Sequence, residues 1–114
     1  MHKHYLEPCM QHFKIDINCD MGEGMGNEAY IMPYISSANI ACGGHTGNAD
    51  SIKRTIEIAV KNNVAIGAHP SYNDKENFGR VSQFISVLEL AELIAEQYYQ
   101  FEKIANQLGA PIHH

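Results

Sequence analysis

The residues that could do chemistry in this sequence are acids and histidines that stand beside glycines. Asp20 opens the stretch DMGEGMG, His45 follows two glycines in ACGGHTGNAD, and His69 lies in AIGAHPSY. Histidine is a common metal ligand, and it changes its charge near neutral pH. One aspartate and two histidines that converge would suit a divalent metal with an open position, or general acid and base catalysis. Each histidine could equally be hydrogen-bonded in a tight turn, and spacing alone leaves both interpretations open.

Short stretches with strand character precede these residues. Strict alternation over 13–20 predicts a strand with an apolar face of Ile15, Ile17 and Cys19 and an acidic opposite face. A second strand is predicted over 37–42. The run VAIGA, 64–68, is typical of a strand that is buried on both faces. Another strand is expected to begin at Ile112.

Two stretches have helical spacing. The first starts from an N-cap at Asn48 or Asp50 and continues to Asn63. The second begins with the S-x-x-E capping box at 86–89 and stops at Gly109. Its apolar stripe is predicted to comprise Leu90, Ala91, Ile94, Tyr98, Phe101, Ala105 and Leu108.

The alternation of strand and helix predicts a parallel β/α architecture. Right-handed crossovers place the carboxyl ends of successive strands on one rim, where β/α proteins gather catalytic groups. Asp20, His45 and His69 all fall at or just after such ends. We therefore expect these three side chains to meet at one rim.

The acidic face of the first strand has two interpretations. Asp16, Asn18 and Asp20 point the same way, and Glu23 lies just beyond them. They could form the solvated outer face of an edge strand. Inside a barrel unpaired carboxylates are costly, so they could instead form a polar site in which Asp20 and Glu23 act as metal ligands or general bases.

Three further features carry weaker hypotheses. Gly43 and Gly44 precede a helix, and this arrangement can hold a carboxylate or a phosphate, although neither nucleotide-binding glycine motif is present. Cys42 could be a nucleophile, but its apolar strand favours a buried thiol. Arg80 could pair with a substrate carboxylate or be an ordinary surface arginine.

Composition excludes several classes of protein. The formal net charge of -5 and the lack of a Lys/Arg cluster argue against a nucleic-acid-binding surface. No apolar run is long enough to span a bilayer. The three cysteines form no C-x-x-C pair, so we expect reduced thiols in a cytoplasmic protein, two of them buried in strands. Residues 1–12 resemble a loose leader, whose histidines could also capture a stray metal ion.

Several motifs together resemble one family. KIDINCDMGEG, SSANIACGGHTGNAD, VAIGAHPSYNDKENFGR and the final IHH are similar to the LamB/YcsF family over about residues 14–114. The resemblance implies an α/β fold, a seven-stranded (β/α) barrel related to polysaccharide deacetylases. Residues 13–114 would supply its first three to four β/α units, as an incomplete barrel.

The resemblance also implies a function. The family contributes one component of an enzyme that opens 5-oxo-L-proline to L-glutamate with hydrolysis of ATP, together with partner subunits B and C. It implies nucleotide binding and a place in carbohydrate metabolism. Asp20, His45 and His69 would be catalytic, and they would also be the ligands of any divalent metal. The residues expected to bind substrate are Asp16, Asn18, Glu23, Asn39, Gly43, Gly44 and Arg80.

This sequence departs from the family pattern in places. Asn48 stands where the family usually has Asp, and Asn73 where it usually has Pro. Family members are about twice as long, and the KPHG motif that follows their next strand is absent. The chain is therefore expected to be an N-terminal portion that ends inside a strand.

Two alternatives to the family function stay open. One is a metal-dependent amide hydrolase that needs no ATP. The other is a catalytically inert fragment or assembly module, and we expect the chain alone to be inactive. An incomplete barrel leaves strand edges and its inner face uncovered, which predicts self-association.

Overall fold

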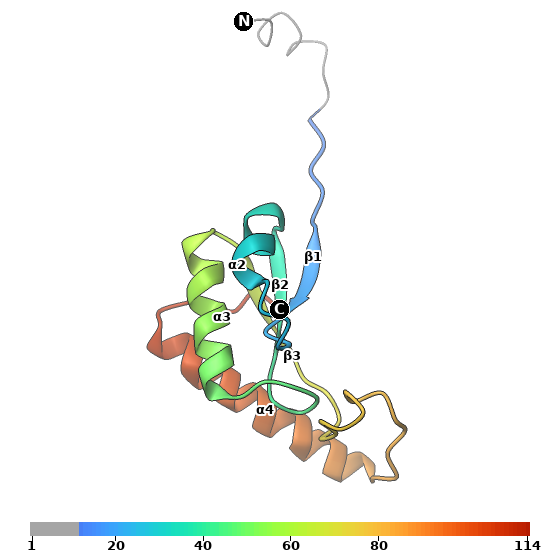
Figure 1. Cartoon of the computed structure of the whole chain (residues 1–114). Helices are drawn as coiled ribbons and strands as arrows, with labels where there is room; N and C mark the ends of the chain where they lie inside the picture. The colour runs from blue at the N-terminus through green and yellow to red at the C-terminus, as the bar shows by residue number, and fades with distance from the viewer. Residues whose placement is uncertain (1–11) are drawn as a thin grey trace, which may run out of the picture.

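The computed structural model describes residues 12–114. The prediction of a loose leader over 1–12 therefore lies almost entirely outside the described residues. Figure 1 shows how the strands and helices alternate along the chain. The elements are β1 (Asn18–Met21), α2 (Glu28–Ile31), the 3-10 helix η2 (Met32–Tyr34), β2 (Ser37–Ala41), α3 (Ala49–Lys61), β3 (Ala65–His69) and α4 (Val87–Gln107).

The three strands form one parallel sheet in the order β1-β2-β3. Parallel neighbours need a crossover connection, which α2 with η2 and then α3 supply. In the register Asp20 lies opposite Asn39, and Asn39 lies opposite Gly67. The expected α/β class with parallel strands is confirmed, whereas closure of these strands into a barrel stays a prediction.

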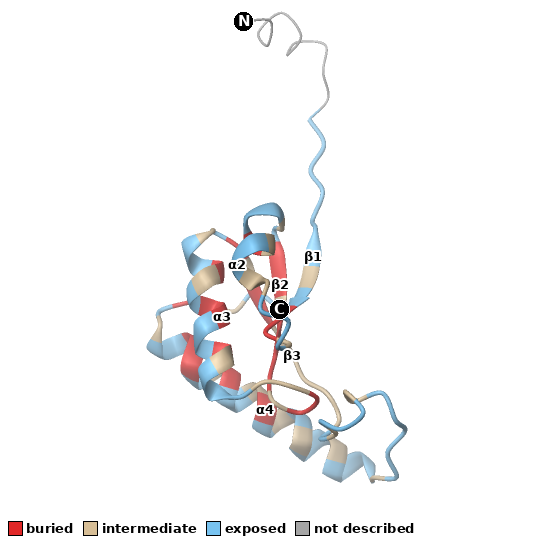
Figure 2. Ribbon diagram, viewed as in Figure 1, coloured by how far each residue is buried: buried red, intermediate tan, exposed pale blue. Residues whose placement is uncertain are grey.

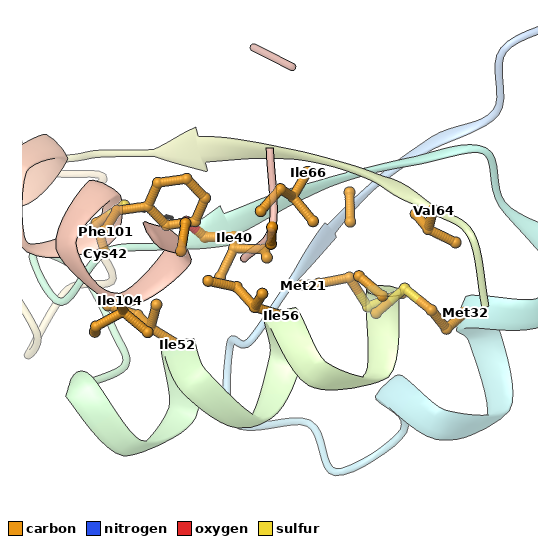
Figure 3. Close-up of a cluster of buried hydrophobic side chains, with 14 residues drawn as sticks. Met21, Met32, Ile40, Cys42, Ile52, Ile56, Val64, Ile66, Phe101 and Ile104 are labelled. Carbon is orange, nitrogen blue, oxygen red and sulfur yellow. Dashed lines mark hydrogen bonds between the residues drawn. The ribbon is translucent and has the colours of Figure 1, made fainter. Parts of the chain in front are cut away.

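The hydrophobic core lies between the sheet and the helices α3 and α4 (Figure 3). Ile40 and Ile66 contribute from the sheet, and both are buried because the helices cover this face. Each fully buried side chain of this size contributes about 1.5–3 kcal/mol of transfer free energy. The helices contribute Ile52, Ile56, Ala59, Phe101, Ile104 and Ala105 to the same cluster.

The opposite face of the sheet is polar. Asp20, Asn39 and His69 fall on it because side chains alternate along a strand. Beyond β3, Ile112 forms an isolated parallel bridge with Ile66, where the sequence predicts the start of another strand. The ring of His114 lies directly over Gly67, so closely that no side chain would fit at residue 67 without displacing it.

Two strand predictions need correction. The first strand begins at Asn18 rather than residue 13, because β2 begins opposite Asn18 and offers 13–17 no strand to pair with. Ile15 and Ile17, predicted to form the apolar face of this strand, are 81% and 49% exposed. Figure 2 shows the segment before β1 as exposed. β3 is buried only in part: Ile66 faces the core and Gly67 is buried under His114 on the opposite face, whereas Ala65 and Ala68 are half-buried.

Both long helices form where the sequence predicts them. Asn48 caps α3: its side chain accepts from the Ser51 N–H, and the Ser51 hydroxyl oxygen accepts from the Asn48 backbone N–H. Gly109 adopts a φ of 66° just past α4, the left-handed geometry of a helix stop.

The predicted apolar stripe of α4 is buried only in its second half. Phe101 and Ala105 are buried together with Gln97 and Ile104, whereas Ile94 is 41% exposed. The first half of the helix runs past the sheet (Figure 1), so most of its residues are exposed and none is buried. No helix within the described range is long and apolar enough to cross a membrane.

Candidate active site at the ends of the strands

Four side chains named from the sequence meet where the strands end. The Nε2 atom of His45 lies 2.9 Å from Oε1 of Glu23. The Nε2 atom of His69 lies 3.5 Å from the same Glu23 oxygen and 3.6 Å from Oδ2 of Asp20. The structure therefore brings Asp20, His45 and His69 together at one rim, with Glu23 at the centre of the group.

The local fold explains how these residues arrive there. Asp20 lies in β1, and His69 is the last residue of β3. His45 comes from the loop between β2 and α3, and Glu23 from the glycine-rich loop after β1. The strands are parallel, so all four approach from the same side of the sheet.

His45 is the buried member of the group, with 3% of its surface exposed. Its Nδ1 atom lies 2.8 Å from Oγ of Ser71. The ring of Phe78 packs edge-on against the imidazole, with the ring centroids 4.7 Å apart. The imidazole is therefore held from three sides, by Glu23, Ser71 and Phe78.

The glycine before His45 is required by packing. A Cβ on Gly44 would lie 2.7 Å from Oε1 of Gln97 and from the carbonyl and hydroxyl oxygens of Ser71. The Gln97 amide in turn accepts from the Ser71 N–H and donates to the Ser71 carbonyl oxygen. Gln97 thus fixes the Ser71 backbone from α4. The loop that carries His45 can pack against Ser71 and Gln97 only because residue 44 has no side chain.

Ser71, Phe78 and Gln97 were not predicted from the sequence. Ser71 stands two residues after His69 in a loop whose composition indicates only that it is polar. Gln97 had a detectable signal: it is a polar residue four positions before Phe101, where the helix faces the core. Phe78 had no signal, because nothing local links it to His45.

A cavity of about 230 Å³ opens over this group. Arg80 lines it, so a guanidinium stands beside carboxylates and imidazoles. The volume is below the range of drug-sized ligand pockets, which suits a small metabolite. The lining residues are Asp20, Glu23, His45, His69, Ser71, Phe78, Gly79 and Arg80.

The predicted substrate-binding residues of the sheet face lie farther along β1 and β2. Asn39 donates a hydrogen bond from Nδ2 to Oδ1 of Asp20 at 3.0 Å, and so orients that carboxylate. Asn18 donates to Oδ1 of Asn39 at 3.1 Å. Asp16 precedes β1 and accepts hydrogen bonds from Ser36 and Ser37, at the opposite end of the strand from Asp20.

The predicted substrate-binding glycines lie elsewhere. Gly43 and Gly44 line a separate cavity of about 220 Å³ beside α4 and do not line the histidine cavity. Their role in holding an anion stays a prediction.

The two cysteines that the structure describes are free thiols. Cys42 is buried, as predicted, and burial raises the pKa of its thiol to about 11, which favours a structural role over a nucleophilic one. Cys19 is only half-buried, contrary to the expectation of two buried thiols. Cys19 faces the core, but it lies in β1, an edge strand in the described part of the sheet, where the core covers it only in part.

Fold and site together define an α/β protein of parallel strands with an acid–histidine site at the strand ends. The LamB/YcsF family model matches residues 15–114, and the chain belongs to the LamB/YcsF family.

Two curated relatives carry the same name, the A subunit of 5-oxoprolinase. The protein from Bacillus cereus is 39% identical over 105 residues, which cover 88% of this chain and 42% of that protein. The protein from Tolumonas auensis is 41% identical over 106 residues, which cover 89% of this chain and 42% of that protein.

A solved structure is also similar. The lactam utilization protein from Thermus thermophilus matches with a TM-score of 0.86 and 34% identity, over 90% of this chain and 43% of that one. The chain thus spans about two fifths of the length of the proteins that it matches.

Proposed function

We propose that this chain carries part of the active site of a lactam-opening hydrolase of the same type as the 5-oxoprolinase A subunit. Its substrate would be 5-oxo-L-proline, and its product L-glutamate. ATP would be hydrolysed in the reaction, and subunits B and C would be the partners. The names of the relatives and of the Thermus thermophilus protein support the substrate class.

The observation that carries the proposal is the small polar cavity at the strand ends. Lactam opening requires attack of water on the carbonyl carbon, cleavage of the C–N bond and delivery of a proton to the ring nitrogen. The hydrogen-bonded pair of Glu23 and His45 can accept and return protons beside a bound substrate. Arg80, at the same cavity, can bind the substrate carboxylate through two parallel hydrogen bonds.

ATP has a defined chemical purpose in this proposal. A five-membered lactam has little ring strain and is a poor electrophile. Transfer of a phosphoryl group from ATP to the lactam oxygen would leave ADP and make the carbonyl carbon more electrophilic. Addition of water, protonation of the ring nitrogen and cleavage of the C–N bond would then give an acyl phosphate of glutamate, from which a second water would release phosphate. Asp20 and His69 would then lie beside the activated carbon to orient the attacking water.

Substrate binding can be tested on the chain itself. We expect 5-oxo-L-proline to shift the NMR signals of His45 and His69, and Arg80→Gln to weaken binding at least tenfold because a charge-assisted pair is lost. The matched ligand is 2-pyrrolidinone, which has the ring without the carboxylate; its weaker binding should not depend on Arg80. Equal binding of both ligands to the chain and to Arg80→Gln would contradict the role of Arg80.

Turnover is tested in the complex with subunits B and C. Alanine at His45 or His69 should reduce ATP-dependent glutamate formation about 100-fold or more, the size of a lost acid–base contribution. Unchanged turnover in both variants would reject these catalytic roles.

A second candidate is an amide hydrolase that uses a metal and no ATP. The convergence of Glu23, His45 and His69 favours it, since their ligand atoms all lie within 4.8 Å of one another. Amide hydrolysis by the chain with added Zn²⁺ or Mn²⁺ and no nucleotide would favour this candidate over the first.

A further inference from the structure

The Glu23, His45 and His69 group has the spacing of a metal site. In a tetrahedral site with metal–ligand bonds of about 2.0–2.2 Å, neighbouring ligand atoms lie about 3.3–3.6 Å apart. The contact of the Glu23 oxygen with His69, at 3.5 Å, falls in this range, and its contact with His45, at 2.9 Å, is shorter. Asp20 adds a fourth ligand atom, an oxygen 3.6 Å from His69 Nε2.

The partners of His45 suit a metal ligand. Its Nδ1 atom lies 2.8 Å from Oγ of Ser71, and the Ser71 hydroxyl has another acceptor in the Tyr72 carbonyl oxygen, at 3.0 Å. When the hydroxyl donates to that carbonyl, its oxygen accepts from Nδ1–H of His45, and Nε2 then directs its lone pair toward Glu23, 2.9 Å away. In that arrangement a cation between Nε2 and the Glu23 carboxylate would bind both.

The cation can be a proton or a metal ion, and the surroundings favour a metal ion. A single shared proton satisfies His45 and Glu23 but gives no reason for His69 and Asp20 to approach the same point. Two carboxylates and two neutral imidazoles balance the charge of one divalent ion. A metal-bound histidine almost always donates its other ring N–H to a fixed acceptor, and the Ser71 hydroxyl oxygen lies 2.8 Å from Nδ1 of His45, in the place of such an acceptor.

We propose that Glu23, His45 and His69 bind one divalent transition-metal ion, with Asp20 as an adjacent fourth ligand. Mixed nitrogen and oxygen ligands of this type suit Zn²⁺ and its neighbours Co²⁺ and Mn²⁺. The ligand set differs from the sequence-based one because Glu23 takes the central place given to Asp20. A bound ion would polarise a substrate carbonyl in the cavity. The proposal rests on the same cavity as the proposed function, but ion binding is measured without turnover.

The experiment measures ion binding to the 114-residue chain. All proteins carry alanine at His2, His4 and His12, so that the N-terminal histidines cannot contribute. After chelation and dialysis against Co²⁺, we expect one ion per chain and the visible absorption of tetrahedral Co²⁺. Zn²⁺ should displace it in competition.

Variants then locate the ion. Glu23→Gln and His69→Gln should weaken Co²⁺ binding at least about 100-fold and change the absorption spectrum. Ser71→Ala should weaken binding about 10–100-fold, the usual effect of losing a partner that orients a ligand. His113→Gln is the matched control, because this exposed histidine lies outside the group, and its binding should not change. Circular dichroism verifies that each variant is folded.

Two results would overturn the proposal. One is a chain that takes up no Co²⁺ or Zn²⁺, which would leave His45 and Glu23 as a pair that shares a proton. The other is equal ion binding by Glu23→Gln and His69→Gln, which would place the ion elsewhere. Ion binding without 5-oxo-L-proline binding would contradict the proposed function alone, and substrate binding without an ion would contradict the metal site alone.

Discussion

Two serine hydroxyls at the start of β2 hold the pKa of the Asp16 carboxyl below its ordinary value. The hydrogen bond from Ser36 contributes most, followed by the one from Ser37. Both favour the ionised carboxylate, because an ionised carboxyl group only accepts hydrogen bonds. Because the Asp16 pKa is lower in the folded state, this interaction stabilises the fold at pH values above the Asp16 pKa of the unfolded chain. The contribution is lost as the pH falls through the folded-state pKa.

Replacing the serines should therefore move this titration. We expect Ser36→Ala to raise the Asp16 pKa toward its ordinary value, and Ser37→Ala to raise it less. NMR titration of the carboxyl carbon measures both shifts, and acid unfolding of Ser36→Ala should begin at a higher pH. Ser82→Ala, at an exposed position far along the chain, serves as the control. An Asp16 titration that stays in place in both variants would show that the serines do not set its pKa.

Single residues differ in how far the sequence alone could locate them. Asp20, His45 and His69 were predictable because each lies at or just after the end of a recognisable strand, and parallel strands end on one side. The contact between Ser71 and Gln97 was not predictable, since it joins a loop to α4 across 26 positions of sequence. The central position of Glu23 depends on the conformation of a glycine-rich loop, which periodicity does not encode.

Among the helices and strands, the ends of the helices were the most predictable features. A capping residue acts within one turn, so Asn48 and Ser86 could be recognised from their neighbours alone. Strand limits depend on a partner strand, and for this reason β1 begins at Asn18, well inside its alternating pattern. The exposure of the first half of α4 likewise depends on what lies beside it.

The cap of α3 supports a prediction about stability. Asn48→Ala removes the acceptor for the Ser51 N–H and should lower the free energy of unfolding by about 1 kcal/mol. Asn48→Asp is the matched control, since aspartate caps a helix as well as asparagine and should leave stability nearly unchanged. Urea denaturation measures both changes. Equal destabilisation by the two variants would show that the cap hydrogen bond is not what stabilises this end of the helix.

Across the molecule, much apolar surface lies outside the core. Phe13, Ile15 and Ile17 are exposed before β1, and no strand pairs with the outer edge of β1 in the part of the chain that the structure describes. The polar face of the sheet has no layer of helices over it within that same part, because α3 and α4 both pack on the other face. Unpaired strand edges with apolar side chains are templates for pairing with another chain.

This surface predicts that the chain associates with a second copy through the β1 edge. Sedimentation velocity should show a mass that rises with concentration toward a dimer. Charged side chains on an edge segment oppose its pairing with another chain. The double variant Ile15→Lys, Ile17→Lys should therefore form the dimer only at a higher protein concentration. Val87→Lys is the control, because this residue is 86% exposed on α4 and lies away from the sheet edge. A monomer at every concentration would contradict the prediction, and an equal shift in the control would place the contact on another surface.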